Sequence, residues 1–114
     1  TAEHAFQAAK FADLEHQETI RTARSPRLAK KLANEMFKDF IDPLWHEKNI
    51  SVMEAIIRAK ATQHEDIRAL LQESGDEEII EDSPTDYFWG IGQDGTGQNM
   101  LGKAWMKIRA EIGA

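Results

Sequence analysis

An acid, an amide and an amine lie at helical spacing near the start of the chain. At about 100° per residue, Glu3, Gln7 and Lys10 fall within an arc of about 60° on one helix. Phe6 borders this arc on one side and Phe11 on the other. A carboxylate and an amine so placed can act as a general acid and base, or as a nucleophile with its proton carrier. An ordinary solvated polar face fits the same pattern, and spacing alone favours that alternative.

A second group of candidate residues surrounds a glycine-rich segment. Residues 90–95 match the letters G-x-G-x-x-G, but no β-branched strand precedes them and too few residues follow for a βαβ unit, so we reject a dinucleotide fingerprint. Glycines ahead of a helix that starts near Asn99 can present backbone N–H groups to an anion, although a flexible connector is the alternative. Asp86 can bond hydroxyl groups and Trp89 can stack on a planar base, which favours a ligand-binding loop.

Lys60 falls in the middle of an apolar helical stripe formed by Val52, Met53, Ile56 and Ile57. A lysine whose stem packs while its ammonium group reaches water is one explanation. A binding-site lysine is the other, because an unpaired buried charge is costly. Both explanations stay open.

The remaining reactive residue types limit the chemistry further. The chain has no cysteine, which excludes disulfides, thiolate metal sites and a cysteine nucleophile. His64-Glu65 is followed by Arg68 where a zincin motif needs a second histidine. We expect the other histidines on the surface: His4, His16 and His46.

Length and composition favour one helical domain. The 114 residues are 41% hydrophobic, which suits a single domain over residues 1–114 with a modest core. A net charge of −6 disfavours a broad nucleic-acid surface, which needs an excess of Lys and Arg. No apolar run approaches the length that spans a bilayer, and the lack of cysteine fits a reducing compartment, so we expect a cytoplasmic protein. Because Thr1 opens almost directly into a helix without an initiator Met, we expect the natural N-terminal segment to be missing.

These candidate residues must be positioned by helices. Ser25-Pro26 has the types of an N-cap and a first-turn proline, and Ser51 with Glu54 has the spacing of a capping box. The predicted fold is mainly α, a compact multi-helix domain with at most a small β element. The expected elements are helices over about residues 2–15, 26–37, 51–64 and 65–73, a short strand over residues 78–81, and a last helix from about residue 99.

Motifs along the whole chain occur in the order seen in one known family. The most specific are the E-H-x-F-Q-x-x-K run at residues 3–10 and the D-x-x-W-G-x-G…G-x-N-x-L-G run at residues 86–102. The chain therefore resembles the NADAR, or YbiA-like, domain family of N-glycosidases. Ala61 departs from the family, which usually has an aromatic residue there, and so does Ser74, where the family has Thr before Gly-Asp. Further matching pieces are Ser25-Pro26-Arg27, Ala29, Trp45, residues 53–60, Leu70-Leu71, Gly75-Asp76, Ile80-Glu81, Met106 and Arg109.

The resemblance implies hydrolysis of the bond between ribose C1 and an exocyclic amino nitrogen. The implied substrates are ribosylamino-pyrimidine phosphates of riboflavin synthesis, or ADP-ribosylated guanine, free or in single-stranded nucleic acid. No metal, organic cofactor or membrane is implied. The candidate catalytic residues are Glu3, Lys10 and Asp86, and the candidate substrate-binding residues are Gln7, Lys60, Trp89, Gly90, Gly92 and Asn99.

Two mechanisms remain open from the sequence. In the first, the glycosylamine opens to an imine that a neutral Lys10 attacks, with Lys60 as a nearby cation and Glu3 as the proton shuttle. An ion pair between Lys10 and Glu3 would oppose this, because it raises the pKa of the lysine. In the second, Glu3 or Asp86 activates water and Lys10 stabilises the departing nitrogen or a phosphate. Glu81 is either a further site acid or a surface residue.

Two other classes of protein keep parts of this pattern. A module that binds ADP-ribose or a nucleotide without cleaving it uses the same residues. A helical interaction domain needs the polar stripe and Lys60 to be ordinary surface, and it leaves the glycine-rich loop beside Trp89 unexplained.

Overall fold

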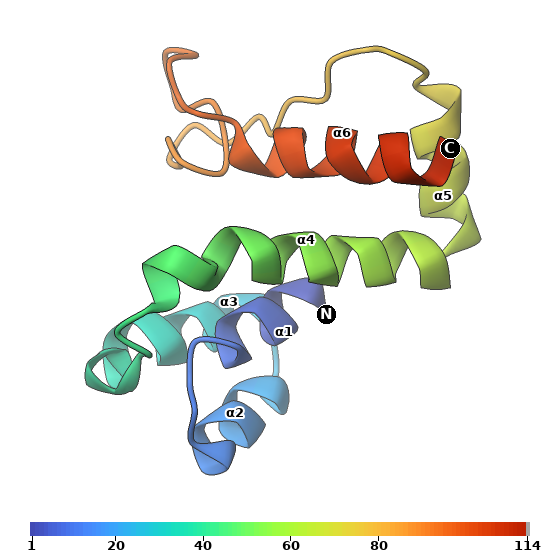
Figure 1. Ribbon diagram of the computed structural model, residues 1–114. Coiled ribbons are helices and arrows are strands. Elements are labelled where there is room, and N and C mark those ends of the chain that lie inside the picture. Colours follow the sequence, from blue (N-terminus) through green and yellow to red (C-terminus); the bar gives the residue numbers. More distant parts are fainter. Residues whose placement is uncertain (114) are drawn as a thin grey trace. The chain divides into compact units, whose positions relative to one another are not determined.

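The computed structural model describes residues 1–113, which confirm the mainly α prediction (Figure 1). The chain divides into two compact units, Thr1–Val52 and Met53–Ala114. No strand occurs within residues 1–113, and no helix in that range is long and apolar enough to cross a membrane. The elements in chain order are α1 (Ala2–Ala8), α2 (Leu14–Arg21), α3 (Pro26–Lys31), a π-helix (Leu32–Met36), a 3₁₀-helix (Lys38–Phe40), α4 (Trp45–Gln63), α5 (Glu65–Glu73) and α6 (Met100–Gly113).

The first predicted helix is shorter than expected. The prediction of one helix over residues 2–15 is wrong, because α1 ends at Ala8 and a separate helix, α2, begins at Leu14. The N–H of Lys10 donates to the carbonyl of Gln7, three residues back, which tightens the last turn. The Asp13 carboxylate then accepts the N–H groups of Glu15 and His16, so it caps a new helix instead of continuing the old one.

The core of the first unit depends on small residues in α3 and in the π-helix that follows it. Ser25 caps α3 by accepting the N–H of Leu28, and Pro26 occupies the first turn, as predicted. Ala29 and Ala33 have no exposed area, and they share a cluster with larger side chains. Their short side chains let α1 approach closely. The buried members of this cluster are Ala8, Phe11, Ile20, Ala29 and Ala33.

Two of the three histidines expected on the surface lie elsewhere. His4 is buried, because its Nδ1 lies 2.6 Å from the Thr1 hydroxyl oxygen and its Nε2 lies 2.9 Å from the Ala23 carbonyl oxygen. His16 is half-buried, with its ring 4.7 Å from the Phe37 ring between centroids. The surface position of His46 is confirmed.

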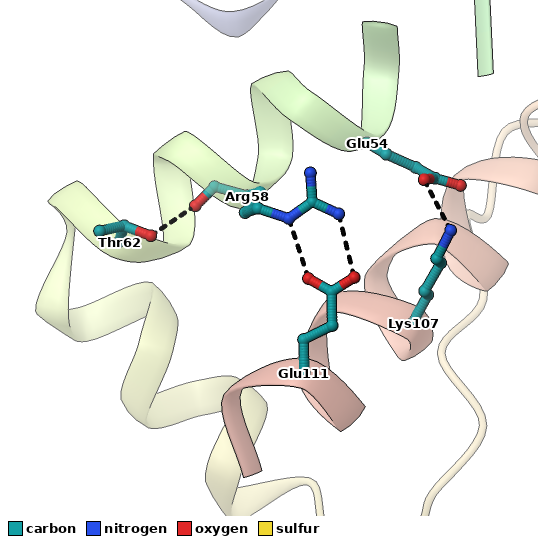
Figure 2. Close-up of polar contacts among 5 residues, drawn as sticks. All are labelled: Glu54, Arg58, Thr62, Lys107 and Glu111. Atoms are coloured by element: carbon teal, nitrogen blue, oxygen red, sulfur yellow. Dashed lines mark hydrogen bonds and ion pairs between the residues drawn. The ribbon is translucent and has the colours of Figure 1, made fainter. Parts of the chain in front are cut away.

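In the second unit, the C-terminal part of α4 packs along α6 (Figure 1). Arg58 donates twice to the Glu111 carboxylate, at 2.9 and 3.0 Å, and Lys107 donates to Glu54 at 2.9 Å (Figure 2). Both pairs are 53 residues apart, so these stretches run in the same direction. Exposed ion pairs add little stability, and the apolar cluster contributes more. Its buried members are Ile57, Ala61, Leu71, Ala104 and Ile108.

Lys60 does not lie on the buried face of α4. It is exposed, whereas the adjacent Ala61 has no exposed area and Ile57 is almost fully covered. The placement of Lys60 at the centre of the buried stripe is therefore wrong. The helix turns its Ala61 side toward the core, since residues four apart, 57 and 61, share a face.

Candidate functional site

The amine of Lys10 lies in the first unit between one polar side chain and two aromatic rings. The side chain is buried, with 8% of its surface exposed. Its Nζ donates to the side-chain oxygen of Asn34 at 2.7 Å. The same Nζ lies 5.7 Å from the centroid of the Phe6 ring and 5.9 Å from that of the Trp45 ring. These aromatic faces favour a cation and also keep water away from it.

The two aromatic rings beside Lys10 differ from the predicted pair. Phe6 is one of them, as expected, and its ring meets Trp45 edge-on with centroids 5.1 Å apart. Phe11 instead belongs to the core, where its ring packs edge-on against Phe37. The early end of α1 explains this difference, because Phe11 no longer follows the helical wheel on which the prediction rests.

The surroundings of Lys10 lower its pKa, and burial is the main cause. Burial lowers the pKa of Lys10 below its usual value, the carboxylate of Glu3 raises it by a smaller amount, and the positive charge of Lys30 lowers it further. The sequence leaves open whether burial or the acidic neighbour has the larger effect on the pKa of Lys10. In the structure, burial has the larger effect. Within the first unit, the cation that acts on this amine is Lys30, on α3.

Glu3 and Gln7 are two further polar residues of this site, and their side chains contact each other. The side-chain amide nitrogen of Gln7 donates to Glu3 Oε1 at 3.2 Å, as expected for residues one helical turn apart. Gln7 is 3% exposed, and its side-chain oxygen Oε1 is buried without a hydrogen-bond partner among the described residues. A buried acceptor without a donor is costly unless a ligand completes it. The structure therefore brings together three predicted site residues of this unit: Glu3, Gln7 and Lys10.

In the second unit, Asp86 fixes the backbone at Trp89. One carboxylate oxygen of Asp86 accepts the N–H groups of Phe88 at 2.9 Å and of Trp89 at 2.7 Å. The half-buried indole of Trp89 meets the Phe88 ring edge-on, with centroids 4.9 Å apart. Asp86 therefore has a clear structural task, which the sequence did not indicate.

The glycine-rich loop uses its own N–H groups. Those of Ile91 and Gly92 donate to the carbonyls of Glu81 and Ser83, and that of Gly97 donates to Ile91. These N–H groups are therefore not free to bind an anion, so they do not contribute to the predicted anion-binding loop. Gly92 has a φ of +73°, and a Cβ at this position would collide with the ring of Tyr87. The glycines serve a tight turn and close packing.

Asn99 holds the segment that was predicted as a strand. Its side-chain oxygen accepts the N–H of Glu81 at 2.8 Å, and its side-chain nitrogen donates to the carbonyl of Ile79 at 2.9 Å. The strand prediction is wrong because these backbone groups bond to a buried amide and not to a partner strand. Asn99 also has a positive φ of 54°, a conformation that asparagine tolerates better than most residues.

We expect Asn99→Ala to destabilise the protein by about 3 kcal/mol, because it leaves two backbone groups without partners and strains the backbone. Asn99→Gly loses the same hydrogen bonds but relieves the strain, so it should be about 1 kcal/mol more stable than the alanine variant. Urea unfolding of both variants measures the free energy lost with the hydrogen bonds and the part that is due to backbone strain. Wild-type stability in Asn99→Ala would contradict this role of Asn99.

Comparisons with known proteins agree with this architecture. The family model of the NADAR domain matches residues 1–113. The N-glycosidase YbiA of Escherichia coli K12 is 36% identical over 112 residues, covering 98% of this chain and 69% of that protein. The riboflavin biosynthesis protein VVA0006 of Vibrio vulnificus is 36% identical over 112 residues, covering 98% of this chain and 30% of that protein. The NMR structure of E. coli YbiA superimposes with a TM-score of 0.90 at 34% identity, covering 99% of this chain and 67% of that one.

The helical fold and these matches define the class, and the chain belongs to the NADAR domain family. The predicted family is thus confirmed. The names of the relatives place the chain in a family of N-glycosyl hydrolases.

Three residues near Lys10 were not predicted as site residues: Asn34, Trp45 and Lys30. Lys30 and Asn34 are four apart and follow the fully buried Ala29 and Ala33 by one position. That pattern places both beside the stripe that contacts α1, so a helical wheel indicates their side of the helix but not their contact with Lys10. Within residues 1–113, no group of three or more His, Asp or Glu side chains is arranged to hold a metal ion.

Proposed function

We propose that this chain hydrolyses the bond between ribose C1 and an exocyclic amino nitrogen, with ribosylamino-pyrimidine phosphates of riboflavin synthesis as the favoured substrates. Membership of a family of N-glycosidases supports the reaction. A relative named for riboflavin biosynthesis supports the substrate class, and the net charge of −6 weighs against ADP-ribosylated guanine in nucleic acid. The observation that carries the chemistry is the buried Lys10 amine, whose pKa is lowered by desolvation.

The proposed reaction proceeds through an imine. Opening of the glycosylamine ring gives a C1=N bond to the base amine, and the lone pair of neutral Lys10 adds to C1. The bond between C1 and the base nitrogen then breaks as that nitrogen gains a proton, which leaves C1 in an imine with Lys10. Water adds to this imine, and collapse of the adduct releases the free sugar and restores the amine. A lysine with a lowered pKa supplies the neutral nucleophile that the first addition needs.

Glu3 and Gln7 have distinct roles in this proposal. Glu3 carries protons between the attacking amine, the departing base nitrogen and water, since its carboxylate is close enough to influence the charge of Lys10. Gln7 orients Glu3 through their 3.2 Å hydrogen bond. The side-chain oxygen Oε1 of Gln7, which has no partner among the described residues, accepts a hydrogen bond from a substrate hydroxyl or amine.

For the second unit we propose substrate-binding roles. Trp89 offers an indole for stacking on a base, and Asp86 holds its backbone in place. Lys60 is exposed and thus available to a phosphate. Gly90 and Gly92 allow the tight packing of the loop. Asn99 holds the neighbouring segment in place through its hydrogen bonds to Ile79 and Glu81.

Incubation with each substrate class tests the function directly. We expect mass spectrometry to show release of the aminopyrimidine base and ribose phosphate from the ribosylamino-pyrimidine phosphate. An oligonucleotide carrying ADP-ribosylated guanine forms the second arm, and faster release there would reassign the substrate. Binding of either compound without release of base would show a non-catalytic binding module and contradict the proposal.

A further inference from the structure

We propose that Asn34 is a positioning residue that holds the amine of Lys10 in its reactive orientation. The inference rests on the proposed role of Lys10 as the nucleophile. The two residues are 24 positions apart, and the 2.7 Å bond between Lys10 Nζ and Asn34 Oδ1 is the one hydrogen bond that the described residues give to this amine.

The backbone around Asn34 departs from a regular α-helix. Beyond α3 the chain forms a π-helix over Leu32–Met36, in which the N–H of Phe37 donates to the carbonyl of Leu32, five residues back, at 2.8 Å. The wider turn of a π-helix changes which side chains share a face with the buried Ala33. Such turns are rare and often occur at functional sites, because they redirect a side chain at a cost in helix stability. Here the π-helix contains the Asn34 side chain that meets Lys10.

The chemistry of an amide fits this task better than that of a carboxylate. A neutral lysine amine has two N–H bonds and one lone pair. If one N–H donates to Asn34, rotation about the terminal bond is restricted and the lone pair points away from the amide. An uncharged acceptor achieves this without the strong stabilisation of the ammonium form that an aspartate would give. The charged groups that act on Lys10 are Glu3 from α1 and Lys30 from α3, and Asn34 adds no third charge.

The isosteric variant Asn34→Asp separates this role from a merely structural one, because it keeps the shape and the acceptor but adds a negative charge. We expect kcat for base release at neutral pH to fall about tenfold or more. Activity should rise with pH as Lys10 loses its proton, and in this variant that rise should occur at higher pH than in the wild type. Asn34→Ala should also lower kcat, but with the rise displaced to lower pH, because an acceptor for the ammonium form is lost. Circular dichroism melts of both variants check that the fold is kept.

A second measurement follows Lys10 without any substrate. Acetic anhydride modifies neutral amines, so peptide mass spectrometry of Lys10 acetylation against pH reports its protonation directly. We expect the Asn34→Asp curve to lie at higher pH than the wild-type curve. Lys31→Gln makes the same change in net charge at an exposed position of α3 and should leave the curve in place.

The two measurements distinguish failure of this inference from failure of the proposed function. Superimposable acetylation curves for wild type and Asn34→Asp would overturn the positioning role, whatever the activity. A displaced curve in a protein that releases no base would support the contact with Lys10 and reject the glycosidase mechanism. A displaced curve together with a displaced activity profile supports both.

Discussion

Lys10→Arg is expected to abolish base release, with kcat at least about 10³-fold below that of the wild type. Arginine keeps the positive charge but has no accessible neutral form and cannot form the imine. If Lys10 only stabilised a departing nitrogen or a phosphate by its charge, the arginine variant would retain much of the activity. Steady-state kinetics of Lys10→Arg beside Lys10→Ala therefore distinguish covalent catalysis from direct hydrolysis.

Borohydride trapping provides the second measurement for Lys10. Reduction during turnover should attach the sugar to the wild-type protein through a stable amine on Lys10, visible as a mass increase in that peptide. Both Lys10 variants should show no such adduct. Lys31→Arg makes the same chemical change at an exposed position and should keep the wild-type rate and adduct. A wild-type enzyme that turns over without forming an adduct would favour the direct route.

Local sequence rules predicted the parts of the site that depend on neighbouring residues. The start of α3 follows from Ser25 and Pro26, since a cap and a first-turn proline act within one turn. The contact between Glu3 and Gln7 follows from their spacing on α1. Lys10 lies beyond the end of that helix, so its burial results from packing and not from the helical wheel.

The sequence could not supply the contacts that join distant segments. Asn34 meets Lys10 across 24 residues, and Trp45 approaches Lys10 from the start of α4. The same reason explains the failed strand prediction. Residues 78–81 have β-forming types, but a strand requires a partner, and the side chain of Asn99 bonds their backbone groups instead. Tertiary context overrode local preference at this segment.

Glu3→Gln tests the proton shuttle and the electrostatic balance at once. We expect kcat to fall by about 10²–10⁴-fold, because an amide cannot carry a proton between amine, leaving group and water. The rise in the remaining activity with pH should nevertheless move to lower pH. The Glu3 carboxylate raises the pKa of Lys10, so its removal lets burial and Lys30 lower that pKa further, and the neutral amine then appears at lower pH.

Lys30→Gln is the matched control, because it removes the opposite charge beside the same amine. The positive charge of Lys30 lowers the pKa of Lys10, so its loss should move the rise in activity to higher pH while leaving the maximal rate near that of the wild type. Opposite displacements in the two variants, measured as kcat against pH, can arise only if the titrating group responds to both charges, as Lys10 does. Displacements of the same sign, or none, would show that the rate is governed by another group and that Lys10 does not act as the neutral nucleophile.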